Sequence, residues 1–311
     1  MRIVIRGDIP PATIEDFRAA ASQAEVIALR PDGDLASVIG DAEVVAGDVP
    51  ADLFARGGRL AWVHSWAAGP DTQLYPAMID SPVVLTCSKG NGAIPLAEHA
   101  ILLMLMLSRD ALRWIRAQDA RRWERFRHGE LNGLTCGIVG TGHSGADLAI
   151  KAKAFHMRTI GLSRSGAARP HFDTMLASGD LDVLLRESDF VVVTAPLTPE
   201  TAGLIGEAEL RRMKASAFIV CFSRGGIIDE AALLHALREG WIAGAGLDAH
   251  ATEPLPADSP LWIAPNTIVT PHNGATTQAT VERGYAIFRD NLARYVRGEP
   301  LRNVVDKHAG Y

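Results

Sequence analysis

Cysteine is scarce in this sequence, and the few cysteines are scattered. Only three occur among 311 residues, at Cys87, Cys136 and Cys221. They form no CxxC pair and no cluster with histidine, so the pattern indicates neither a disulfide framework nor a zinc site or other metal site. We therefore expect a reduced, cytoplasmic protein.

Long apolar runs are also missing. The most apolar stretch covers 94–109, and its uninterrupted part, 100–107, is far shorter than the ~20 residues that span a bilayer. We interpret it as a buried helix. The opening RIVIRG is typical of a short strand and not of a signal peptide.

Neither positive nor negative charge dominates the sequence. The chain has 31 basic and 36 acidic residues, a formal net charge of -5, and both signs are spread along its length. This distribution provides no basic stripe for nucleic acid and no polybasic patch for a membrane surface. The expected partner is a small molecule.

What the sequence does have is enough apolar material for two cores, since 48% of its 311 residues are hydrophobic. Short β-branched runs alternate with helical patterns, which favours parallel sheets with crossover helices. We expect strands at 3–5, 26–29, 44–46, 61–64, 83–85, 136–139, 158–162, 190–194, 218–221, 242–246 and 267–269.

Two helices indicate the domain boundaries. A long helix is predicted over 95–118, and an arginine-rich polar stretch follows it. A final helix over 276–297 is long enough to carry the chain back to the first domain. We therefore predict a discontinuous domain of residues 1–94 plus 284–311, and a second domain of residues 95–283.

A glycine pattern, Gly140-x-Gly142-x-x-Gly145, directly follows the predicted strand CGIVG and opens a helix. In a dinucleotide site the first glycine permits the tight turn, the second lets the backbone approach the pyrophosphate, and the third lets helix and strand pack closely. The helix N-terminus, at His143 and Ser144, then offers N–H groups to phosphate. A glycine-rich turn without a nucleotide is the alternative reading, but its position between strand and helix favours the dinucleotide.

The next strand ends in Ser163-Arg164-Ser165. An acidic residue about 20 positions after the glycines would hold the ribose 2′-OH of NAD, whereas an arginine accommodates the 2′-phosphate of NADP. An arginine between two hydroxyls suits a dianionic phosphate, and Arg169 can add to it. We therefore predict NADPH as the preferred cofactor, with NAD possible. An ordinary polar loop is the alternative.

Three further segments contain the chemically active side chains. They are SRGGIIDE from Ser223, GLDAHATEPLP from Gly246 and TPHNGATT from Thr270. With the glycine loop, the order and spacing of Arg224, Glu253 and His272 resemble the D-isomer-specific 2-hydroxyacid dehydrogenases, and the resemblance covers essentially the whole chain.

That resemblance implies an α/β fold of two domains. One is a Rossmann-type doubly wound parallel sheet for the cofactor, and the other is a smaller, flavodoxin-like α/β substrate domain. SWAAGPDT, from Ser65, is similar to the family's substrate-carboxylate loop. The short length and Arg164 make the chain most similar to the glyoxylate and hydroxypyruvate reductases.

The side chains fit the chemistry that the resemblance implies. A 2-oxo acid that accepts hydride develops negative charge on its carbonyl oxygen, and His272 can supply the proton while Glu253 orients the ring. Arg224 can hold the substrate carboxylate with its planar fork, and the backbone N–H groups of Ala68 and Gly69 can complete the anion site. We expect this active site in the cleft between the domains.

The resemblance also assigns Asp248 and Pro196 to the cofactor site, with Asp248 near the nicotinamide carboxamide. Two positions depart from the family pattern: Cys221 stands where asparagine is common, and His250 where phenylalanine is common. They put the substrate range in question more than the reaction type.

Other polar or aromatic residues have blander interpretations. We interpret Glu98 and His99 as residues near the start of the apolar helix, without a part in catalysis. Lys89 and Asn91 either face the cleft or lie in a solvated loop. Trp66 either forms a wall of the substrate pocket or packs in the core.

We therefore predict an NADPH-dependent enzyme that reduces a small 2-oxo acid, such as glyoxylate or hydroxypyruvate, to the D-2-hydroxy acid. The alternative from another class is a dinucleotide-sensing binding protein with little turnover. Phosphoglycerate and formate dehydrogenases are related alternatives. We expect no added regulatory domain, which weakens the first, and Glu253 stands where formate enzymes have glutamine, which weakens the second. Long apolar helices at the domain junction indicate a homodimer built on the cofactor domains.

Overall fold

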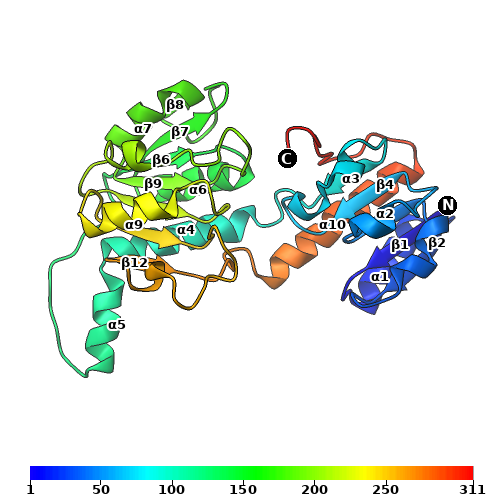
Figure 1. The fold of residues 1–311 in the computed structure, drawn as a ribbon, viewed down its shortest axis with the longest axis horizontal. Helices are drawn as coiled ribbons and strands as arrows, with labels where there is room; N and C mark the ends of the chain where they lie inside the picture. The colour runs from blue at the N-terminus through cyan, green and yellow to red at the C-terminus, as the bar shows by residue number, and fades with distance from the viewer. Residues whose placement is uncertain (311) are drawn as a thin grey trace. The chain divides into compact units, whose positions relative to one another are not determined.

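The computed structural model describes residues 1–310, which form two compact units (Figure 1). The first unit contains Met1–Gly92 and the chain from Thr277 onward, and the second contains Ala93–Thr276. The boundary expected after residue 283 lies inside helix α10 (Gln278–Val296), which belongs as a whole to the first unit.

The first unit is built on a five-stranded parallel sheet in the order β2-β1-β3-β4-β5. This is the flavodoxin-like strand order. Its strands are β1 (Arg2–Arg6), β2 (Glu25–Leu29), β3 (Val44–Ala46), β4 (Trp62–Ser65) and β5 (Val84–Cys87).

Both faces of this sheet are buried, as the near-continuous apolar strands require. Helices α1 (Pro11–Ala20) and α10 cover one face, where Phe17 and Phe288 pack on Trp62 and its neighbours. Short helices cover the other: α2 (Ala51–Phe54), α3 (Pro76–Ile79), and the 3-10 turns η1 (Leu35–Ser37), η2 (Ile39–Asp41) and η3 (Asp71–Gln73).

The second unit is built on a seven-stranded parallel sheet in the order β12-β11-β10-β9-β6-β7-β8. This is the doubly wound Rossmann order, extended by one strand. Its strands are β6 (Thr135–Val139), β7 (Arg158–Ser163), β8 (Thr174–Ala177), β9 (Phe190–Val193), β10 (Phe218–Cys221), β11 (Gly244–Leu247) and β12 (Thr267–Val269).

Alternate residues of these strands enter two cores. One core lies under α4 (Ala93–Ser108) and α6 (His143–Ala154), and includes Val192 and Val220. The other lies under α7 (Leu181–Glu187), α8 (Glu207–Leu210) and α9 (Glu230–Arg238), and includes Val191 and Val193. The 3-10 turns η4 (Ser178–Asp180) and η5 (Pro260–Ile263) complete the unit.

One local prediction was wrong, and one strand was missed. The helix expected over 95–118 is two helices, α4 and α5 (Ala111–Asp119), because Asp110 adopts a left-handed conformation with φ 50° that ends the first one. Strand β8 was not expected, since it is a short, half-buried edge strand whose apolar residues, Met175 to Ala177, are not β-branched. Within residues 1–310, no helix is long and apolar enough to cross a membrane.

Candidate active site

Glu253 and His272 form a hydrogen-bonded pair beyond the ends of two neighbouring strands. Glu253 follows β11 and His272 follows β12, and these strands pair in parallel, so both loops leave the same edge of the sheet. The Nδ1 atom of His272 lies 2.9 Å from Oε1 and 2.8 Å from Oε2 of Glu253. Because the carboxylate accepts from Nδ1, the Nε2 atom of the half-exposed ring is left for a ligand.

The carboxyl group of Glu253 is held in its charged form. Burial acts to raise its pKa, but hydrogen bonds from the backbone N–H of His250 and from the His272 ring outweigh burial and lower the pKa of Glu253 below its usual value. The His250 N–H lies 2.9 Å from Oε1. Glu253 can therefore accept the Nδ1 proton of His272 and support a charged imidazolium.

The backbone at His272 is left-handed, with φ 51°, which costs a non-glycine residue about 1–2 kcal/mol. The buried carboxylate of Asp248 supports this turn: it accepts the N–H of Asn273 and the N–H of Gly274, each at 3.0 Å. Hydrogen bonds to a charged group contribute about 1.5–3 kcal/mol each, so the two together outweigh the strain. Asp248 thereby fixes the conformation from which the His272 ring projects.

His99 belongs to the same cluster, which the sequence did not reveal. Its Nε2 atom lies 3.0 Å from Oγ1 of Thr270 and 3.5 Å from Oδ1 of Asp248. Thr270 Oγ1 in turn lies 2.6 Å from Asp248 Oδ1. The interpretation of His99 as a residue near a helix start was incomplete, because α4 begins at Ala93 and its second turn brings His99 onto this cluster. A histidine, next to Glu98, in a largely apolar helix was the one available signal.

Arg224 follows β10, the neighbour of β11 in the sheet. Its Nη1 donates to the carbonyl of Ser223 at 2.7 Å. The next residue, Gly225, lies so close to His250 that a Cβ there would come within 2.0 Å of the His250 carbonyl carbon and oxygen. Glycine is therefore required for the Arg224 turn to pack beside the segment that contains Glu253.

The two departures from the family pattern lie in this region. Cys221 is buried, which raises the pKa of its thiol, and its Sγ contacts the carbonyl of Arg224 at 3.5 Å. The Nε2 atom of His250 lies 3.0 Å from the carbonyl of Thr270, and its buried Nδ1 has no hydrogen-bond partner among residues 1–310. Both side chains fit the site without disturbing the Glu253–His272 pair.

The glycine loop joins β6 to α6. Gly140 has φ 98°, and a Cβ there would lie 2.7 Å from the backbone nitrogen of Ala195. A Cβ on Gly145 would lie 2.2 Å from the carbonyl oxygen of Gly140. The first and third glycines are therefore required by the turn and by close helix–strand packing.

The second glycine differs, because no atom lies within 4 Å of a Cβ built on Gly142. Gly142 is also the N-cap of α6, where no side chain caps the helix. The N–H groups at His143 and Ser144 thus begin a helix whose N-terminus is open to a ligand. These features fit the pyrophosphate of a dinucleotide.

At the end of β7, the two serines form tight turns. Ser163 Oγ accepts the N–H of Gly166 at 3.2 Å, and Ser165 Oγ accepts the N–H of Ala167 at 3.3 Å. Each hydroxyl acts as an acceptor within its turn, and its own O–H can still donate to an anion. Arg164, between them, is exposed.

Arg169 and Pro196, both expected at the cofactor site, make hydrogen bonds within the second unit. Arg169 donates through Nη1 to the carbonyl of Thr141 at 2.8 Å, so it braces the glycine loop. Pro196 lies exposed after β9, and its carbonyl accepts the hydroxyl of Thr201 at 2.7 Å.

In the first unit, Ala68 and Gly69 follow β4. Ser88 holds the preceding turn, since its N–H donates to the carbonyls of Ala67 at 2.9 Å and of Ser65 at 3.1 Å. Across the part of the chain that the structure describes, the N–H groups of Ala68 and Gly69 donate no hydrogen bond. Two donors are thus available on a held loop, as an anion site requires.

Three residues of the first unit that had two interpretations have these contacts in the structure. Trp66 donates through Nε1 to the carbonyl of Arg6 at 3.0 Å and packs against Tyr285 and Phe288. Asn91 is buried, and its carbonyl accepts Nε of Arg283 at 2.6 Å. The carbonyl of Lys89 accepts the side-chain amide of Asn303 at 2.9 Å.

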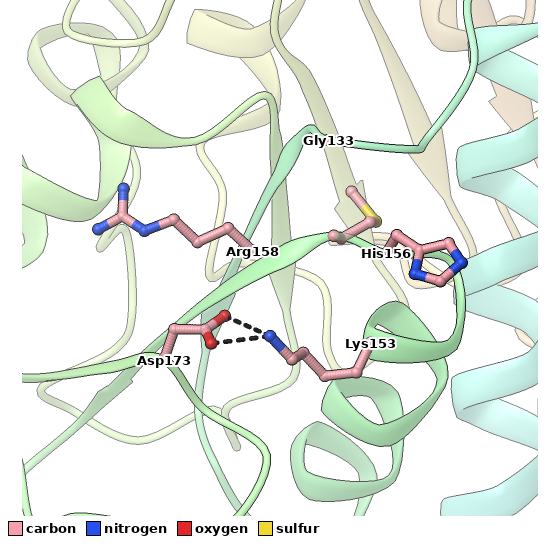
Figure 2. Close-up of a pocket in the computed structure, with 6 residues that line it drawn as sticks. Gly133, Lys153, His156, Arg158 and Asp173 are labelled. Carbon is pink, nitrogen blue, oxygen red and sulfur yellow. Dashed lines mark hydrogen bonds and ion pairs between the residues drawn. The ribbon is translucent and has the colours of Figure 1, made fainter.

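An open hollow in the second unit lies at the opposite edge of the sheet, near the starts of β6 and β7 (Figure 2). Its charges are already paired: Lys153 contacts both oxygens of Asp173, at 2.7 and 2.8 Å, and Arg158 contacts Glu187 at 2.7 Å. Ligands of open α/β sheets bind at the carboxyl ends of the strands, so this hollow is not part of the candidate site.

Comparison with known proteins assigns the family. Residues 101–274 match the NAD binding domain of the D-isomer specific 2-hydroxyacid dehydrogenases. A glyoxylate reductase of Korarchaeum cryptofilum is 35% identical over 267 residues, which cover 83% of this chain and 80% of that protein.

A D-3-phosphoglycerate dehydrogenase of Archaeoglobus fulgidus is 33% identical over 83% of this chain, but the match covers only 49% of that protein. The structure of an NADPH-dependent glyoxylate/hydroxypyruvate reductase of Sinorhizobium meliloti, in complex with NADP and sulfate, superposes with a TM-score of 0.84 at 28% identity, over 100% of this chain and 99% of that one. The chain therefore belongs to the D-isomer-specific 2-hydroxyacid dehydrogenase family, as an NAD(P)-dependent 2-oxo acid reductase.

Proposed function

We propose that this protein uses NADPH to reduce a small 2-oxo acid, glyoxylate or hydroxypyruvate, to the corresponding D-2-hydroxy acid. The observation that carries the proposal is the Glu253–His272 pair, with Nδ1 bound to the carboxylate and Nε2 left for the substrate. Glyoxylate reductase is the name of the Korarchaeum relative, and the Sinorhizobium structure bears a similar name, which supports this substrate class.

His272 is the proposed proton donor. When bound, the reduced nicotinamide supplies the hydride to the carbonyl carbon. His272 Nε2 then gives its proton to the carbonyl oxygen, where negative charge develops. Glu253 stabilises the imidazolium before this transfer and keeps the ring oriented through Nδ1. In the oxidation direction, the neutral ring accepts the same proton.

Arg224 is the proposed partner of the substrate carboxylate. Its guanidinium stays charged and presents paired donors, which match a carboxylate and also polarise the adjacent carbonyl. The N–H groups of Ala68 and Gly69 are the proposed additional donors, because no described residue accepts from them. All of these proposed contacts are to the carboxylate and carbonyl of the substrate, and none is to a longer side chain. We therefore propose a small substrate.

The proposed cofactor site has three parts. Gly140, Gly142, His143, Ser144 and Gly145 would hold the pyrophosphate at the open N-terminus of α6. Ser163, Arg164 and Ser165 would hold the 2′-phosphate, with NAD accepted less well. Pro196 and Asp248 would lie at the nicotinamide end.

We also propose that the protein is a homodimer built through the second unit. Several large apolar side chains of this unit are exposed on α4, α5 and the segment after them: Leu102, Trp114, Ile115 and Trp123. A soluble chain rarely leaves so many in one region uncovered.

The function is tested by NADPH and NADH oxidation, side by side, with glyoxylate, hydroxypyruvate, pyruvate and phenylpyruvate. We expect turnover with glyoxylate or hydroxypyruvate, and a kcat/KM at least about tenfold higher with NADPH than with NADH. The Arg164→Ala variant should lose most of this cofactor preference and keep its activity with NADH.

Two results would contradict the proposal. If the protein binds NADPH but no 2-oxo acid supports its oxidation, a dinucleotide-sensing protein becomes the better account. If Arg164→Ala keeps the parent ratio of cofactor efficiencies, the 2′-phosphate does not bind at Ser163–Ser165.

A further inference from the structure

We propose that His99 is a positioning residue for His272, and that it acts through Thr270 and Asp248. Its effect on turnover rests on the proposed function, whereas its effect on the structure of the His272 turn does not. His99 lies on α4, far from His272 in the sequence, and three observations connect the two.

The first observation is a directed chain of hydrogen bonds. Thr270 Oγ1 lies 2.6 Å from Asp248 Oδ1, and a carboxylate can only accept, so the threonine proton points to Asp248. The threonine oxygen can then accept from Nε2–H of His99, 3.0 Å away. This fixes the proton of a neutral His99 on Nε2.

The second observation is that Asp248 links this chain to the catalytic turn. Its Oδ1 accepts the N–H of Asn273 and its Oδ2 accepts the N–H of Gly274, so both residues after His272 are held. Asp248 is fully buried and the His99 side chain is 13% exposed, so water competes little for these bonds. His99 therefore helps to fix the carboxylate on which the left-handed turn depends.

The third observation is direct contact. A Cβ built on Gly274 would lie 2.9 Å from Asp248 Oδ2 and 3.0 Å from Cδ2 of His99. The imidazole and the carboxylate together form the surface against which the turn packs. Glycine at 274 lets the backbone approach that surface.

The position of His99 on α4 makes this support rigid. Its helix neighbours Ala100 and Ile101 are buried in the same core as Ile268 of β12. The helix is thus anchored to the strand that leads into Thr270 and His272. His99 connects that anchored helix to the loop at the strand end.

Three variants test the proposal. His99→Phe keeps an aromatic ring but removes both nitrogens. His99→Gln keeps a donor at a similar distance from the backbone. Leu107→Ala is the matched control, because Leu107 is a buried residue of the same helix that makes no contact with the Asp248 cluster, and its truncation tests for general destabilisation.

The readouts are deuterium exchange of the backbone over 270–277, kcat and KM for the 2-oxo acid, and the Kd of NADPH. We expect His99→Phe to speed exchange in this segment about tenfold and to lower kcat about tenfold, with KM and Kd within about twofold of the parent. His99→Gln should restore both quantities to within about threefold of the parent.

The proposal is wrong if His99→Phe leaves exchange over 270–277 unchanged. It is also wrong if Leu107→Ala accelerates that exchange as much as His99→Phe does, because the effect would then be general. If the parent reduces no 2-oxo acid, the proposed function fails, and the exchange data alone decide whether His99 positions the turn.

Discussion

Buried polar side chains beneath the strand ends organise both units. In the first unit, His64 at the end of β4 is fully buried, with Nδ1 2.8 Å from Oγ1 of Thr86 and Nε2 3.3 Å from Oγ of Ser88. Trp62 donates to the same Thr86 oxygen at 2.8 Å, so the threonine proton is free to point at His64 Nδ1. These bonds satisfy a neutral imidazole directly below the loop that contains Ala68 and Gly69.

Burial lowers the pKa of His64 to about 3. In the unfolded chain a histidine titrates near 6.5, so below that pH the unfolded state binds a proton that the folded state excludes. The stability that a neutral His64 permits is present above pH ~6.5 and is lost as pH falls toward 3.

We predict that the His64 side chain alone lowers the free energy of unfolding by about 2 kcal/mol when the pH falls from about 7.5 to about 5. Urea unfolding of the parent and of His64→Gln at both pH values measures it. The variant should be less stable at neutral pH, but its stability should fall less on acidification. Equal losses in the two proteins would show that His64 is not the responsible group.

At the residue scale, the sequence predicted the site roles of side chains whose residue type and position after a strand are typical of this chemistry. Arg224, Glu253 and His272 each follow a recognisable strand, and parallel strands bring their ends to one edge. The role of Asp248 as the support of the His272 turn, and that of His99 beside it, were not predicted. Those roles depend on contacts between residues far apart in the chain, which no local pattern contains.

Among the elements, α5 and the segment after it stand out, because they project away from the sheet of the second unit (Figure 1). The two pack on one another. The ring centroids of Trp114 and Phe126 lie 5.7 Å apart, and Nε of Arg113 donates to Oε1 of Glu124 at 2.6 Å. Trp123 in this segment is 95% exposed. A folded projection with an exposed tryptophan fits the proposed dimer contact.

We predict that the parent sediments as a dimer and that Trp123→Glu shifts it to a monomer, because a charge at the centre of an apolar contact is costly. Phe155→Glu, which changes an exposed aromatic residue of the second unit outside the projection, serves as the control. A monomeric parent, or a Trp123→Glu variant that stays dimeric, would exclude this contact.

Predictability differed between element types for physical reasons. Central strands such as β3 and β10 are continuous apolar runs, because both faces of each sheet are covered, and the sequence predicted their bounds closely. The edge strand β8 has a run of three apolar residues, but none is β-branched and all are only half-buried. The break between α4 and α5 falls at Asp110, and neither glycine nor proline marks it there. The helical pattern of the sequence therefore continues across the break, and one long helix was predicted.

On the scale of the whole molecule, the second unit is an insertion into the chain of the first. The proposed proton donor, its carboxylate partner, the arginine and the glycine loop all belong to that inserted unit. Alternating strands and helices, together with the family resemblance, predicted two domains built on parallel sheets, and the structure confirms them. The reaction class was predicted from the motifs and the resemblance they carry, and the comparison with known proteins confirmed it.

The central claim is that His272 supplies the proton in the reduction of a 2-oxo acid. The most direct test compares NADPH oxidation by the parent and by His272→Asn, with NADPH binding measured in parallel. The account predicts a fall in kcat of about 10²–10⁴-fold, with the Kd of NADPH within about twofold of the parent. A His272→Asn variant that turns over at the parent rate would contradict it.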